Sequence, residues 1–146
     1  MEQPMEPTIP SLFTLNTKLD IQEGGLLDGL SGVSVPQAKV TWTIPDRKRK
    51  SFPSQQGPLL ITHHGLSGPA VLRLSAFAAQ EFHAMNYRGI LEVQWDTSLG
   101  DSVDDLSDQL WKVTTIYPKR TVSKVCPLPN NTIPKRLWSA LVLHSG

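Results

Sequence analysis

The stretch 59–75, LLITHHGLSGPAVLRLS, constrains the fold more than any other part of the chain. Its first residues, Leu59–Ile61, form an apolar run that is typical of a buried strand. Gly65 and Gly68 follow, and glycine permits backbone angles and close approaches that a Cβ would block. We therefore predict a strand that ends in a tight turn.

A helix is expected to follow this turn. Ser67 is a favourable N-cap residue, and Pro69 is tolerated in a first helical turn because its missing N–H would have no partner there. The sequence predicts a helix start between Ser67 and Ala70. Apolar residues then recur at helical spacing, at Val71, Leu74, Ala78, Phe82 and Met85. The first-turn N–H groups suit an anion or a polarised ring, and the alternative is a capped junction without a ligand.

Three other segments alternate apolar and polar residues, as half-buried strands do: 13–19, 33–44 and 91–95. The alternation changes parity near residues 36–38, which predicts a bulge or kink. A single helical turn is expected at 26–30. The pattern predicts one β core that contains Phe13, Leu15, Trp42, Val93 and Trp95.

The C-terminal third changes character. Aspartates fill the start of an apolar-periodic helix that ends before Pro118, a loop covers 118–131, and a last helix begins near Pro134. The predicted fold class is α+β, with a small β-barrel-like subdomain that carries one packed helix. A short and incomplete helical subdomain follows it.

The predicted domain limits are a disordered lead at 1–10, the barrel-like subdomain at 11–98 and the helical subdomain at 99–146. The chain has 146 residues, the size of one domain or two very small ones. Its net charge of +1 is too small to produce an electrostatic field that attracts nucleic acid or an anionic membrane. The one cysteine, Cys126, excludes an internal disulfide. No apolar run reaches membrane-span length, and the acidic, proline-rich start is no signal or typical transit peptide.

The exact order of residues in the stretch 59–75 is more informative than the secondary structure that it predicts. Residues 62–70 resemble the signature Thr-His-x-Gly-Leu-Ser-Gly-Pro-Ala of the BaiN-like family of NAD(P)/FAD-dependent oxidoreductases. Segments 10–15, 30–35 and 133–138 resemble other family segments in the same order. His64 departs from the signature, where an aromatic residue is expected. The family's dinucleotide-binding half with G-x-G-x-x-G, and its C-terminal return segment, have no counterpart in this sequence.

The resemblance implies the inserted, substrate-capping domain of a flavin-dependent oxidoreductase. Its partners would be the missing dinucleotide-binding half and a small-molecule substrate. FAD would be the cofactor of the full-length parent, with NAD(P)H as a reductant, and the chain alone is expected to hold no cofactor and to be inactive. His63 would be the proton donor, and Thr62, Gly65, Ser67 and Gly68 would face the flavin. We expect a soluble intracellular protein, in a plastid if the source is a photosynthetic eukaryote.

Other functions remain open from the residues. A non-catalytic β-barrel module that binds protein or RNA is the main alternative, with basic residues at 47–50 and Trp42 and Tyr87 available for stacking. The run 65–69 superficially resembles a hydrolase elbow with Ser67 as nucleophile, but its fifth position is proline and no αβ repeats surround it. No cluster of histidine, cysteine and carboxylate has zinc-like spacing, so we expect no metal site. His63 and His64 would point to opposite faces if they lay in a strand.

Overall fold

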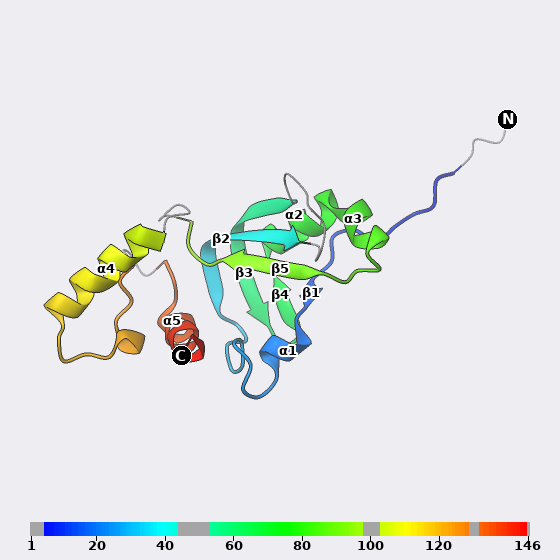
Figure 1. Cartoon of the computed structure of the whole chain (residues 1–146). Helices are drawn as coiled ribbons and strands as arrows, with labels where there is room; N and C mark the ends of the chain where they lie inside the picture. Colours follow the sequence, from blue (N-terminus) through cyan, green and yellow to red (C-terminus); the bar gives the residue numbers. More distant parts are fainter. Residues whose placement is uncertain (1–4, 44–52, 98–102, 129–131, 146) are drawn as a thin grey trace.

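A computed structural model of the protein describes residues 5–43, 53–97, 103–128 and 132–145 (Figure 1). The predicted basic tip at 47–50 and the lead residues before Met5 lie outside them. Five antiparallel strands form one sheet in the order β1-β4-β3-β2-β5. They are β1 (Leu15–Asn16), β2 (Ser34–Thr43), β3 (Ser54–Thr62), β4 (Gly65–Ser67) and β5 (Ile90–Gln94).

Helices occur between the strands and after the last strand in chain order. They are α1 (Lys18–Ile21), α2 (Pro69–Phe77), α3 (Ala79–Ala84), α4 (Val103–Ile116) and α5 (Lys135–His144), with a 3-10 turn η1 (Val122–Lys124) between the last two. The sheet curls into a half-barrel whose two edges are β1 and β5. The predicted α+β class, barrel-like with helices, is confirmed.

The longest strand, β2, contains the predicted bulge. Val35 pairs with Leu59 of β3, whereas the next paired residue, Ala38, faces Gly57. Three residue steps on β2 therefore match two on β3, the signature of one extra residue. Pro36 lies inside this irregular step, where the missing N–H costs no ladder hydrogen bond. The bulge keeps Val35 and Val40 both in the core despite the parity change.

The stretch 59–85 is partly as predicted. A strand precedes a helix that starts at Pro69, inside the predicted window. The predicted position of the tight turn, however, is wrong: the chain turns at His63 and His64, and residues 65–67 form β4, which lies between β1 and β3. The helix also breaks at Ala78, which separates α2 from α3.

The N-terminal strand is shorter than its alternating pattern predicts. Only Leu15 and Asn16 pair with β4, and the chain then turns into α1. The N–H groups of Asp20 and Ile21 donate to the Thr17 carbonyl, which starts this helical turn. Residues 26–30 form hydrogen-bonded turns and no helix.

The core lies between the concave sheet and helices α2 and α3. Its largest fully buried apolar side chains come from the sheet, from α2 and α3, and from α5: Phe82, Leu59, Ile61, Leu74, Leu137, Val35, Val40 and Val71. Of the five residues predicted to be buried in one β core, Trp42 alone belongs to this buried cluster. Trp42 is buried, and Phe13, Leu15, Val93 and Trp95 are partly buried against it.

The last helix joins the same core, while α4 lies farther from the sheet, beyond α5 (Figure 1). Leu137 and Trp138 of α5 are buried among barrel residues. The Thr132 hydroxyl donates to Asp96 Oδ2 at 2.5 Å, and Arg136 Nη2 donates to the Gly29 carbonyl. One buried cluster thus contains residues from both sides of the predicted limit at residue 98.

Candidate functional site

The two adjacent histidines form the tip of the β3–β4 hairpin. Thr62 pairs with Gly65, so His63 and His64 are the two loop residues, and both are exposed. The Thr62 hydroxyl donates to the Gly65 carbonyl at 3.1 Å and accepts from the His64 N–H at 3.2 Å. The hairpin replaces the strand geometry that would send the two imidazoles to opposite faces.

A neighbouring strand fixes the hairpin from the side. The Thr17 N–H donates to the His64 carbonyl at 3.1 Å, directly after Asn16 pairs with Gly65. The hairpin tip is therefore held by backbone bonds on one side and by its own threonine on the other. Its imidazoles are presented to solvent on a fixed support.

The two signature glycines have a packing role in this fold. A Cβ on Gly65 (φ +144°) would lie 2.2 Å from the Leu15 carbonyl oxygen. A Cβ on Gly68 (φ +99°) would lie 2.9 Å from the Pro58 carbonyl oxygen. Glycine is required at both positions because the chain's own backbone fills the space.

Ser67 does not cap the following helix. The residue is half-buried in β4, and the N-cap of α2 is Gly68, with no side-chain cap hydrogen bond. The Gly68 carbonyl accepts the first helical bond, from the Leu72 N–H at 2.9 Å. The predicted N-cap role of Ser67 is wrong because the sheet ladder extends one residue farther than the turn chemistry indicates.

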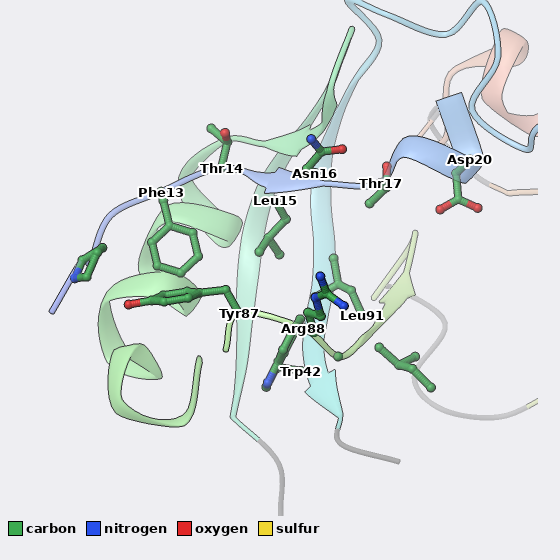
Figure 2. Close-up of a pocket in the computed structure, with 13 residues that line it drawn as sticks. Phe13, Thr14, Leu15, Asn16, Thr17, Asp20, Trp42, Tyr87, Arg88 and Leu91 are labelled. Carbon is green, nitrogen blue, oxygen red and sulfur yellow. The ribbon is translucent and has the colours of Figure 1, made fainter. Parts of the chain in front are cut away.

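A groove opens between β1 and β5, the two edges of the sheet, next to Thr17, which binds the hairpin. It has a volume of about 880 Å³, within the range of small-molecule sites. Its lining comes from β1 and the residues on either side of it, from α1, β2 and β5, and from the segment before β5: Pro10, Phe13, Thr14, Leu15, Asn16, Thr17, Asp20, Trp42, Tyr87, Arg88, Gly89, Ile90 and Leu91. Figure 2 shows Phe13 and Leu15 pointing from the N-terminal segment toward Tyr87 and Arg88.

Aromatic rings form one wall of this groove. The Phe13 ring meets the Tyr87 ring edge-on at 5.6 Å between centroids, and the Phe82 ring at 5.1 Å. Trp42 lies against Phe82 at 4.1 Å. Asn86 and Tyr87 have φ of 50° and 58°, a conformation that non-glycine residues seldom adopt. This turn holds the Tyr87 ring against Phe13.

Two buried polar atoms on groove residues have no hydrogen-bond partner. They are Thr17 Oγ1 and Trp42 Nε1, the only such side-chain atoms among the described residues. Buried polar atoms in native proteins normally have a partner. Both exceptions therefore fall on the lining of one groove.

Sequence reasoning missed most of this groove. The sequence predicts Tyr87 only as a stacking residue for nucleic acid and Phe13 only as a core residue, and it does not single out Arg88. The positive φ of Tyr87 has no sequence signal, since tyrosine has no preference for it. Trp42, a candidate for base stacking, is only 4% exposed.

Other reactive groups are not assembled into a site. Burial raises the pKa of the Cys126 thiol, against a hydrogen bond at Leu128 that lowers it, so the thiolate is disfavoured. Within the described ranges, no three histidine, cysteine or carboxylate side chains gather as a metal site would require. None of the described helices has the length and apolarity to cross a membrane.

Residues 9–146 match the family described as the HI0933-like protein barrel and H2TH domain. The chain belongs to this family. The half-barrel with its helices agrees with the barrel of that description, and the family is linked to FAD-dependent oxidoreductases. No curated protein matches the chain. The narrower BaiN-like resemblance stays a prediction.

Proposed function

We propose that this chain is the inserted domain of an FAD-dependent oxidoreductase, and that it covers the flavin and shapes the substrate pocket. Family membership supports the link to flavoproteins. The observation that carries the capping role is the β3–β4 hairpin, which presents both imidazoles to solvent from a backbone-fixed support. Functional groups are placed more precisely when regular structure and supporting hydrogen bonds hold them, as they hold this hairpin.

The hairpin residues have unequal roles in this proposal. Bound FAD would supply hydride transfer, and the protein would supply orientation and proton positions. His63 is the proton donor, because an imidazole can serve as a general acid and this one is exposed at the hairpin tip. Thr62 acts indirectly, since its hydroxyl already bonds Gly65 and His64 and fixes the loop.

The glycines fit the flavin less directly than the histidine does. The space beside Gly65 and Gly68 is filled by residues of β1 and β3, so neither glycine opens a cradle for a ring. Their contribution is to let β4 lie between its neighbours and so place the hairpin. The Ser67 hydroxyl, half-buried at the end of β4, remains the second proposed flavin-facing group.

The test joins the chain to the dinucleotide-binding half expected in the same gene. The flanking sequence should encode a G-x-G-x-x-G segment. The joined protein should purify yellow with FAD, whereas the 146-residue chain alone should be colourless. Lack of flavin in the joined protein would contradict the proposal.

His63→Ala in the joined protein tests the proton role. The rate of the reductive step should fall by about 10- to 10⁴-fold with an unchanged flavin spectrum. His144→Ala is the matched control, because His144 is also exposed but lies at the end of α5. An unchanged rate for His63→Ala would return this residue to a purely structural role.

The alternative, a non-catalytic binding module, is favoured by one observation, the open groove between β1 and β5. A binding module would use this groove without any flavin half. A gene with no dinucleotide-binding segment on either side would favour it over the capping domain.

A further inference from the structure

The groove between β1 and β5 is separate from the hairpin, because none of residues 62–68 lines it. We propose that it binds a planar aromatic ring that carries a carboxylate. This inference goes beyond the proposed function, since it concerns the chain by itself and needs no flavin. Three features of the groove support it.

The first feature is the aromatic and aliphatic surface. Phe13, Trp42 and Tyr87 line the groove together with Leu15 and Leu91. Tyr87 is 39% exposed, so part of its ring surface is available to a ligand. Aromatic rings gain from edge-to-face and offset contacts beyond their burial. A flat ring matches this wall better than a branched aliphatic molecule does.

The second feature is one cation inside the groove. Figure 2 shows the Arg88 side chain between Tyr87 and Leu91, below the strand that carries Leu15. Arg88 forms no ion pair or side-chain hydrogen bond with another described residue, and its planar guanidinium matches a carboxylate. Asp20 lies at the α1 end of the same groove. The carboxylate of a bound ligand therefore points toward Arg88 and away from Asp20.

The third feature is the pair of buried polar atoms without partners. Trp42 Nε1 and Thr17 Oγ1 each have a hydrogen to donate, and both residues belong to the lining. An uncompensated buried donor is costly. A ligand with an oxygen acceptor offsets this cost when the segment over Trp42 adjusts. Gly89 belongs to this segment, and a Cβ there would lie 2.4 Å from Cζ2 of the Trp42 indole.

The test titrates the isotope-labelled chain with 2-naphthoate and, separately, with the neutral 2-naphthamide. The signals of the four tryptophan indole N–H groups are followed by nuclear magnetic resonance, and Trp42→Phe assigns one of them. The Trp42 signal should shift and saturate below about 1 mM naphthoate. The amide should bind about 5-fold more weakly or worse, because it lacks the charge that Arg88 recognises.

Variants locate the ligand within the groove. Arg88→Gln should remove the preference for naphthoate, and Tyr87→Ala should weaken both probes by about 2- to 12-fold. Arg120→Gln is the matched control, because Arg120 stacks on Tyr117 outside the groove, and it should leave both affinities unchanged. Far-ultraviolet circular dichroism of each variant separates loss of binding from loss of folding.

Three results of the titrations would overturn the proposal. They are the absence of a saturable shift with either probe, equal binding of the acid and the amide, and shifts confined to Trp111, which is exposed on α4. Binding that survives Tyr87→Ala and Arg88→Gln in folded variants would also place the ligand elsewhere.

Discussion

The half-barrel and helix α4 differ in how far their apolar residues are buried. In the half-barrel, Leu59, Ile61 and Phe82 are completely buried between the sheet and α2 and α3. On α4, Leu106 and Leu110 are only partly buried, and Trp111 is 77% exposed. The half-barrel thus contains most of a closed core that α5 completes, whereas α4 exposes Trp111 and Ile116 in the described chain.

This difference indicates where stability and where contact surface lie. Burial of apolar area contributes about 25 cal/mol per Å², so the half-barrel supplies most of the folding free energy. Exposed apolar patches on soluble domains often mark contact sites. Three substitutions test the comparison, and they are given in order of decreasing effect on unfolding.

The largest effect is expected in the barrel core. Phe82→Ala should lower the free energy of unfolding by about 3–5 kcal/mol, because it removes a fully buried ring that contacts Phe13 and Trp42. Urea denaturation followed by tryptophan fluorescence measures this loss. Phe82→Leu, which keeps most of the volume, should cost far less and should fold. A loss below about 1 kcal/mol for the alanine variant would contradict a closed core.

A smaller effect is expected where β4 meets β1. Gly65→Ala should cost at least about 2 kcal/mol, from backbone strain and from the clash with the Leu15 carbonyl. Gly24→Ala is the control, since Gly24 also has positive φ (+82°) but no atom within 4 Å of a built Cβ. It should cost about 1–2 kcal/mol. Equal losses for the two variants would mean that β1 moves aside without penalty.

The smallest effect is expected on α4. Trp111→Ala should change the free energy of unfolding by less than about 0.5 kcal/mol, because most of the side chain is exposed and little buried area is lost. Trp138→Ala is the informative contrast, since Trp138 is buried and its indole N–H donates to the Val122 carbonyl at 2.8 Å. A loss above about 1 kcal/mol for Trp111→Ala would show that α4 packs against something in solution.

The sequence predicted the parts of the fold whose residues repeat with a clear period. Alternation located β2, its bulge and β5, and apolar spacing located α2, α4 and α5. β4 was missed because three residues are too few to show a period, and Ser67 suggested a cap by its side chain alone. What decides its place is the approach of β1 to Gly65, a contact between distant segments.

The two candidate sites also differ in whether their residues are neighbours in the sequence. The sequence singled out His63 and its neighbours because they form one continuous motif, although it did not predict that they lie in a hairpin. The groove was not identifiable, because Phe13, Trp42 and Arg88 come from three separate segments and have no pattern in common. Their convergence follows from the order of strands, which residue spacing does not reveal.

The buried hydroxyl of Ser75 has a consequence for synthesis. It accepts a hydrogen bond from the Phe13 N–H at 2.9 Å, across 62 positions of sequence, and donates to the Leu72 carbonyl. The segment that leads into β1 is translated before its partners on α2 and β4. At about 5–20 residues per second, roughly 3–12 s pass before Ser75 is made. During that interval the emerging chain has Phe13 and Leu15 without their native neighbours, so the start of the barrel is the part most dependent on protection during translation.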